Sequence, residues 1–369
     1  MAGAAPAVPS ISAAALRARR LPLLALGFVS LVGGVLAGLA RMGLSVPQPH
    51  LDLAMLHGPL MVSGFFGTVI ALERAAALGA RWIFAGPLAA GLSGVLLVAG
   101  APPVAAALSM GVASAVLLAA SVWVWTRQKA GFTATMAGGA ACWLVGNLLW
   151  LAGAPMPAAV LWWTLFLVLT IAGERLELSR FRPPTSWAGP AFAAVVGVLV
   201  LGAAVAVAAP DAGFRLAGVG MLALAAWLTR FDVAQRTIRG SGLPRYVAAC
   251  LLSGYAWLAV GGLIAAAGPG VTGGVLYDAV LHSVFLGFVF AMVFGHAPII
   301  LPAVLRLAVP YAPRLYVPLV ALHLGVALRT AGVLADDLAV RQWGGVANAA
   351  SLALFIAVTA HAVLGARSR

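Results

Sequence analysis

The sequence predicts an all-α polytopic membrane protein, a transmembrane helical bundle of about twelve spans that forms one integral-membrane domain over residues 1–369. The first observation is composition: 63% of the residues are hydrophobic and 8% are charged, with a mean hydropathy of +1.07. Soluble domains carry roughly a quarter charged residues. The second observation is that apolar stretches of ~20 residues, long enough to cross a bilayer, recur along the whole chain.

Each expected span is bounded by proline, glycine or basic residues, as in "VPQP" (46–49) and "PYAP" (310–313). Residues 1–20 form a basic cytoplasmic N-terminal segment, and the apolar stretch after it lacks a cleavage site of small residues, which predicts a retained first helix. The predicted spans, in order, are residues 21–43, 52–74, 82–100, 103–126, 132–154, 157–177, 187–209, 212–230, 244–268, 274–304, 315–335 and 342–365.

Charge predicts the orientation of these spans. With a cytoplasmic N-terminus, the outer segments hold only four of the 22 basic residues: Arg41, Arg215, Arg329 and Arg341. Cytoplasmic loops of membrane proteins carry an excess of Lys and Arg. We therefore expect both termini to be cytoplasmic, in a multi-pass protein of the bacterial cytoplasmic (inner) membrane. The net charge of +13 belongs to these short loops, which argues against a nucleic-acid partner and leaves the lipid bilayer as the expected surrounding.

The six histidines sort into two groups by expected depth. His50, His57 and His282 lie toward the outer side, whereas the inner half holds His296, His323 and His361. Ionisable side chains inside a bilayer are costly and mark cofactors, ion paths or proton relays. For His57, His282 and His296 this favours metal or haem ligation. His50 also fits a solvated loop, His323 an interhelical hydrogen bond, and His361 an interfacial side chain.

The interval between His282 and His296 is typical of a helix that ligates two haems. In a regular helix these residues lie ~21 Å apart along the axis and ~40° apart around it. Di-haem b-type cytochromes have paired helices with this spacing, although this sequence contains no second such pair. His57 and His282 would hold an outer haem b, and His296 with His323 or His361 an inner haem or metal. Three imidazoles at one depth, with a methionine, also suit copper.

Two polar side chains near the outer histidines have more than one expected role. Asp278 precedes His282 by four residues, so it could orient that imidazole through a hydrogen bond or simply begin the helix as an acid near its N-terminal dipole. Arg329 could face a haem propionate, or it could pair with Asp336 or Asp337.

Two segments resemble the NnrS proteins, a family of twelve-span membrane proteins associated with bacterial nitric oxide metabolism and reported to hold haem and copper. They are "MLHGPLMVSGFFGTVIAL" (55–72) and "LHSVFLGFVFAMVFGH" (281–296). The resemblance implies His57, His282 and His296 as ligands. In the family, the histidines of the second segment lie further apart, with an arginine between them. The chain is also distantly similar to haem–copper oxidase catalytic subunits, but residues 157–177 lack the histidine that their metal site needs.

The sequence therefore predicts a haem-binding membrane protein, with copper as an open second metal. Its expected role is electron transfer or redox chemistry related to nitric oxide, as an oxidoreductase with a quinone or redox protein as partner. No catalytic residue is identified. Two alternatives stay open: a proton-coupled secondary transporter that uses intramembrane histidines, and a non-catalytic subunit of a respiratory complex.

Overall fold

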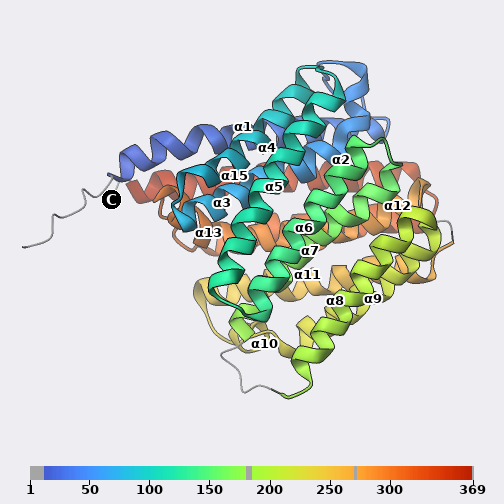
Figure 1. Cartoon of the computed structure of the whole chain (residues 1–369). Helices are drawn as coiled ribbons and strands as arrows, with labels where there is room; N and C mark the ends of the chain where they lie inside the picture. The colour runs from blue at the N-terminus through green and yellow to red at the C-terminus, as the bar shows by residue number, and fades with distance from the viewer. Residues whose placement is uncertain (1–11, 180–184, 270–271, 368–369) are drawn as a thin grey trace, which may run out of the picture.

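The computed structural model describes residues 12–179, 185–269 and 272–367, and it confirms the predicted all-α membrane fold (Figure 1). Within these ranges there is no strand, and twelve helices are long and apolar enough to cross a membrane. Residues 1–11 and the basic residues Arg180, Arg182 and Arg369 lie outside the described part. The membrane-spanning helices account for nearly all of the described chain.

The second and tenth spans are each built of several helical segments. The other spans are continuous helices, in two cases with a short 3₁₀ turn in front, and most of their ends lie close to the predicted boundaries. In chain order the elements are α1 (Ala13–Arg41); η1 (Leu51–Leu56), α2 (His57–Pro59), η2 (Leu60–Phe66) and α3 (Gly67–Leu78); η3 (Arg81–Phe84) and α4 (Ala85–Val98); α5 (Pro103–Arg127); α6 (Gly131–Leu151); α7 (Met156–Ser179); α8 (Ala188–Ala208); α9 (Pro210–Phe231); α10 (Ala234–Thr237); α11 (Gly242–Ala267); α12 (Gly274–His282), η4 (Ser283–Phe290) and α13 (Ala291–Leu305); η5 (Pro313–Leu315) and α14 (Tyr316–Leu334); and α15 (Leu338–Arg367).

The first helix begins earlier than the sequence indicated, at Ala13 instead of residue 21. Its start is fixed by Ser12, whose Oγ accepts a hydrogen bond from the backbone N–H of Ala15 at 3.2 Å. The guanidinium of Arg20 is buried and donates to the carbonyl oxygen of Val304 at 2.7 Å. Arg20 therefore belongs to α1, and its guanidinium satisfies a backbone carbonyl near the end of the tenth span.

The two ends of the chain pack together. α1 contacts α13 and α15, and α3 contacts α13, so the first and last spans lie side by side. In Figure 1 the dark blue start of α1 and the red end of α15 lie at the same end of the bundle, as an even number of spans requires. This arrangement brings the second span beside the tenth.

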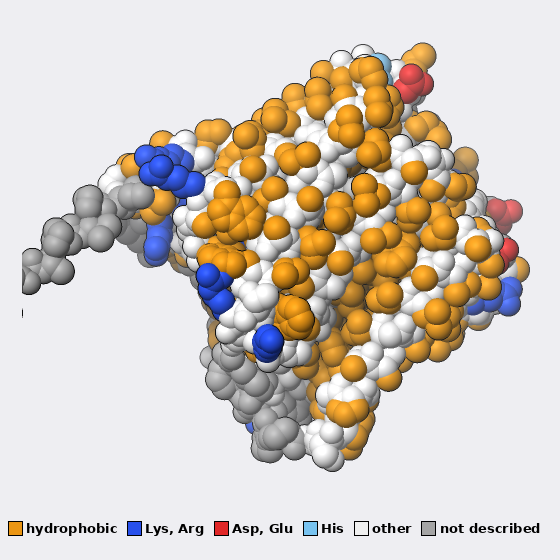
Figure 2. All heavy atoms as spheres, viewed as in Figure 1, with side chains coloured by type: hydrophobic (Ala, Val, Ile, Leu, Met, Phe, Trp, Pro, Cys, Tyr) orange, Lys and Arg blue, Asp and Glu red, His pale blue; other side chains and the backbone are white. Residues whose placement is uncertain are grey.

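The outer surface is largely apolar. In the face shown in Figure 2, hydrophobic side chains cover most of the surface between the two ends of the bundle. Lys and Arg side chains gather near the end where α1 begins, and acidic side chains lie toward the opposite end. This separation is the pattern that the positive-inside rule produces. The cytoplasmic location of the termini stays a prediction.

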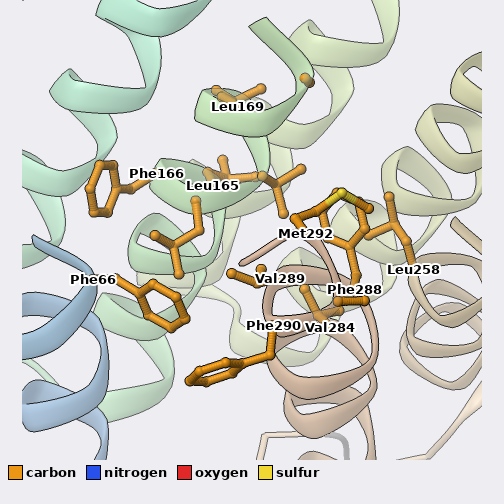
Figure 3. Packing of buried hydrophobic residues seen from close by; sticks show 14 of the residues in the cluster. Phe66, Leu165, Phe166, Leu169, Leu258, Val284, Phe288, Val289, Phe290 and Met292 are labelled. Carbon is orange, nitrogen blue, oxygen red and sulfur yellow. The ribbon is translucent and has the colours of Figure 1, made fainter. Parts of the chain in front are cut away.

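Aromatic side chains fill the space between the second and tenth spans. Phe66 of η2 and Phe290 of η4 point toward one another, with ring centroids 5.0 Å apart (Figure 3). Leu165 and Phe166 of α7 lie beside them, and all four side chains are buried. This packing joins three spans into one core directly next to the segments that carry His57 and His282.

A buried polar network ties the second span to its neighbours. Asn147 of α6, with no exposed surface, accepts hydrogen bonds through Oδ1 from Ser63 (3.0 Å) and Trp163 (2.9 Å). Its Nδ2 donates to the carbonyl oxygen of Met110 (3.0 Å) and to Ser114 (3.1 Å). All four hydrogen-bonding positions of the amide are used, as the membrane interior demands. Asn147 is therefore a structural clamp between spans.

Replacing Asn147 with leucine leaves the Trp163 indole N–H and the Ser63 hydroxyl without their acceptor. We expect a loss of about 1–3 kcal/mol of stability, read as a lower midpoint of thermal unfolding in detergent. Cys142 and Cys250 are free and buried, so their reaction with a thiol-specific dye reports unfolding directly.

Thr126→Val is the matched control, because the exposed Thr126 hydroxyl bonds only to the carbonyl oxygen of Trp123 in its own helix. It should leave the midpoint unchanged. Equal midpoints for Asn147→Leu and the natural protein would contradict the clamp role.

Candidate functional site

The structure brings His57 and His282 together inside the bundle. Their imidazole rings lie nearly parallel, at an interplanar angle of 19°, and the ring centroids are 5.9 Å apart. One ring comes from the second span and the other from the tenth, so residues 225 positions apart in the chain share one site.

Both histidines lie immediately next to a change of helix type. His57 begins the short α2 helix between the 3₁₀ turn η1 and the π-helical segment η2. His282 ends α12, and the π-helical segment η4 follows at once. π-Helical turns are rare and frequently occur at functional sites. The second and tenth spans therefore share a local architecture that the sequence alone did not indicate.

Hydrogen bonds to backbone carbonyls fix the tautomer of both rings. Nδ1 of His57 donates to the carbonyl oxygen of Gly34 at 2.7 Å, and Nδ1 of His282 donates to that of Asp278 at 2.8 Å. A carbonyl oxygen only accepts, so Nδ1 carries the proton and Nε2 keeps its lone pair. Within the described residues, neither Nε2 atom has a hydrogen-bond partner. Two imidazole lone pairs are thus left available.

The first span supports His57, a contact that the histidine pattern did not predict. A Cβ atom on Gly38 would lie 2.8 Å from Cε1 of His57, and one on Gly34 would lie 2.5 Å from Sδ of Met61. Only glycine lets α1 approach closely enough for its carbonyl to reach the imidazole. The sequence does contain a signal, "GVLAG" (34–38), which is a small-residue spacing typical of close helix packing in membranes.

Asp278, one helical turn before His282, forms an ion pair with Arg329. Arg329 of α14 donates two hydrogen bonds to the carboxylate of Asp278, from Nε at 2.9 Å and from Nη2 at 2.6 Å. The same carboxylate lies 3.2 Å from Nδ1 of His282, as expected if Asp278 orients that imidazole. Arg329 is therefore engaged by Asp278, and not by Asp336 or Asp337.

The imidazole pair opens into a cavity of about 600 Å³ between spans 1, 2, 6, 10, 11 and 12. Its lining includes Met156, Pro157 and Val160 of α7, and Gly345, Asn348 and Leu352 of α15. The walls are mostly apolar, and the charged side chains that line it are Arg41, Asp278, Arg329 and Arg341. A volume of this size falls within the range of roughly 300–1,000 Å³ typical of small-molecule and cofactor sites.

The inner site that His296 would form with His323 or His361 stays a prediction. The Arg329–Asp278 ion pair sets the register between α14 and α12, so His323 lies only roughly 9 Å deeper than that pair. His296 lies eighteen residues after Asp278, beyond the π-helical segment η4 and so nearer the other end of the tenth span. His361 is exposed on α15. In the described ranges, no group of three or more His, Cys, Asp or Glu side chains is close enough to hold one metal ion.

The remaining histidines have separate surroundings. Nδ1 of His296 donates to the carbonyl oxygen of Met292 at 2.7 Å, and its charged neighbours are Arg175 and Asp232. Both ring nitrogens of His323 are buried, and within the described part of the chain neither has a hydrogen-bond partner. His50 does not join the imidazole pair, because its Nε2 donates to the carbonyl oxygen of Leu97 at 2.9 Å.

The predicted regular geometry between His282 and His296 is wrong, because η4 separates them. A π-helical segment closes its hydrogen bonds from residue i to i+5, so each of its residues turns the chain by less than in an α-helix. The expected ~40° offset therefore does not hold, and the two imidazoles meet different helices.

The glycines near the histidines mostly serve helix packing. A Cβ on Gly64 would meet Ser30, one on Gly67 would meet Trp143, and one on Gly287 would meet Trp257, all within 3 Å. Gly58 instead lines the cavity beside His57, and a Cβ there would meet only Trp163, at 3.9 Å. Of these four glycines, Gly58 alone leaves space at the site.

A family model described as "Domain of unknown function (DUF8744)" matches residues 20–364, nearly the whole membrane domain. The chain belongs to this family. No curated protein and no solved structure matches it. The description names no ligand or activity, so the resemblance of this DUF8744 protein to NnrS proteins stays a prediction.

The DUF8744 chain offers a direct test of the ion pair behind His282. Asp278→Asn and Arg329→Gln should each reduce stability, because each leaves the charge of the other side chain in a poorly solvated site. The double variant should lose less than the sum, with a coupling of about 1.5–3 kcal/mol. The measurement is unfolding of the purified protein in mixed micelles with increasing denaturing detergent. Arg341→Gln is the control, and its effect should add to that of Asp278→Asn. Additive losses for Asp278→Asn and Arg329→Gln would contradict the pairing.

Proposed function

We propose that this protein binds one haem b in the cavity between His57 and His282, and that it transfers electrons within the membrane. The observation that carries this proposal is the pair of nearly parallel imidazoles, which come from two different spans and whose Nε2 lone pairs have no partner among the described residues. The supporting features are the spacing of the rings, the fixed tautomers and the lining of the cavity.

The ring separation fits a metal ion held between the two imidazoles. If both Nε2 atoms bound one metal ion, metal–nitrogen bonds of roughly 2.0–2.1 Å would require the two ring centroids to lie roughly 6 Å apart. The observed separation is 5.9 Å. The Nδ1–H hydrogen bonds hold each ring in the tautomer that offers Nε2 to a metal, which is the usual arrangement of ligating histidines.

The cavity suits a flat, largely apolar group that carries carboxylates. Met61, Val62, Phe66 and Phe290 supply apolar wall next to the histidines. Arg41 and Arg341 line the same cavity, and guanidinium groups bind carboxylates through paired hydrogen bonds. We assign these two arginines to the haem propionates, since Arg329 is already paired with Asp278.

Bound haem supplies an iron centre that gains and loses one electron. His57 and His282 would both hold the haem through Nε2, and two protein ligands would favour electron transfer over direct reaction with a gas such as nitric oxide. Asp278 lies 3.2 Å from Nδ1 of His282 and holds that ring in the ligating tautomer and orientation. A quinone or a redox protein belongs to the proposal as the source and the acceptor of electrons.

Purified protein should show a Soret band, a b-type α band in the reduced-minus-oxidised spectrum, and one haem per chain by pyridine haemochrome. His57→Ala and His282→Ala should each lose at least roughly tenfold in bound haem, because each removes one of the two side chains that would hold it, in line with the 10–100-fold losses typical of disturbed metal sites. His323→Ala and His361→Ala are matched controls from neighbouring spans and should keep the haem. A spectrum without a Soret band, in cells with ample haem, would refute the proposal.

A second variant tests the position of the site without touching a ligand. Gly38→Leu places a side chain where the His57 ring lies, so it should displace the imidazole and weaken haem binding as His57→Ala does. Gly111→Leu is the control, because a Cβ at Gly111 meets nothing within 4 Å. The measurement is the ratio of Soret absorbance to protein. Full haem content in Gly38→Leu would contradict the assigned geometry.

A further inference from the structure

A second cavity lies at the opposite end of the bundle from the imidazole pair. It measures about 500 Å³ and is formed where α1 begins, where α13 ends and where α15 ends. The residues that line it are Arg17, Arg306, Leu307, Ala308, Val363 and Ala366. The lining thus combines two arginines with small and aliphatic side chains.

The described part of this end of the bundle gathers positive charge. Arg17, Arg19 and Arg20 lie on the first turns of α1, and Arg306 follows α13. Arg20 reaches the carbonyl oxygen of Val304, two residues before Arg306. No ion pair in the described ranges joins any of these arginines to an acidic side chain. Like charges repel one another, so an anion bound between Arg17 and Arg306 would reduce this repulsion.

The backbone at Arg306 presents its side chain at a special position. Arg306 follows the last turn of α13 in the left-handed region, at φ 55° and ψ 39°. Glycine or asparagine usually occupies this position at a helix end. An arginine there accepts an unfavourable backbone conformation and extends its guanidinium from the helix end toward the cavity that α1 and α15 share with it.

We propose that this cavity binds the phosphate group of an anionic phospholipid. Arg17 and Arg306 would bind the phosphate oxygens, since guanidinium groups pair with phosphate through two hydrogen bonds. Leu307, Ala308, Val363 and Ala366 would contact the glycerol and the upper acyl chain. Basic pockets between transmembrane helices on the cytoplasmic side bind such head groups, and the charge distribution predicts that this end is cytoplasmic. The inference is independent of haem.

The test uses full-length purified protein in detergent with equal amounts of phosphatidylglycerol and phosphatidylcholine, followed by native mass spectrometry. The natural protein should retain phosphatidylglycerol preferentially. Arg17→Gln with Arg306→Asn should reduce this preference by about fivefold for each arginine, which corresponds to about 1 kcal/mol per basic residue. Asparagine is used at position 306 because it tolerates the left-handed conformation. Arg236→Gln with Arg239→Gln, two exposed arginines outside the cavity, should leave the preference unchanged.

Two further arms separate lipid binding from phosphate binding and from a folding defect. Val363→Trp fills the cavity without changing charge, and it should reduce lipid binding even if the arginine variant proves unstable. Inorganic phosphate, added at millimolar concentration, should not displace the lipid. Displacement by phosphate, with equal retention of the two lipids, would assign the site to free phosphate and overturn the lipid proposal. Equal lipid preference in the natural protein and the arginine variant would overturn the site itself.

Discussion

The candidate site depends on two hydrogen bonds, in which the imidazoles of His57 and His282 donate to backbone carbonyl oxygens of the membrane domain. Inside a bilayer, each polar group needs a partner from the protein. The carbonyl oxygens of Gly34 and Asp278 take the Nδ1 protons of His57 and His282, and this leaves both Nε2 lone pairs without a protein partner beside a cavity. The spans around them are arranged to keep that pair in place: α1 approaches through glycine, and α14 holds Asp278 through Arg329.

Irregular helices give the site its shape. Segments η2 and η4 each follow a histidine, and they pack against one another through Phe66 and Phe290. A π-helical turn is wider than an α-helical turn, so it changes the direction in which the following side chains point. The direction of each histidine is therefore not tied to the direction of the core side chains that follow it in the same span. The Asn147 network then fixes η2 through Ser63. Segments η2 and η4 therefore contribute both to the candidate site and to the packing that stabilises the bundle.

The two cavities have chemically different linings. The larger one lies between spans that bring a histidine pair, an ion pair and apolar walls together, which suits a planar cofactor. The smaller one lies at the end where α1 begins, and its lining includes Arg17 and Arg306. Both are built mainly by spans from the beginning and the end of the chain, while the middle spans, α5 to α11, mostly provide packing and hydrogen bonds.

The sequence alone determined the membrane class, the twelve spans and the choice of His57 and His282 as candidates, because hydrophobicity and polar residues within apolar runs are local properties of the chain. It did not determine the partners of those residues. The level of His323 could not be deduced, because the register of α14 depends on the contact between Arg329 and Asp278, which are 51 residues apart. The close approach of Gly38 to His57 and the π-helical turn after His282 were likewise decided by packing between spans, and such packing has no fixed signature in a single sequence.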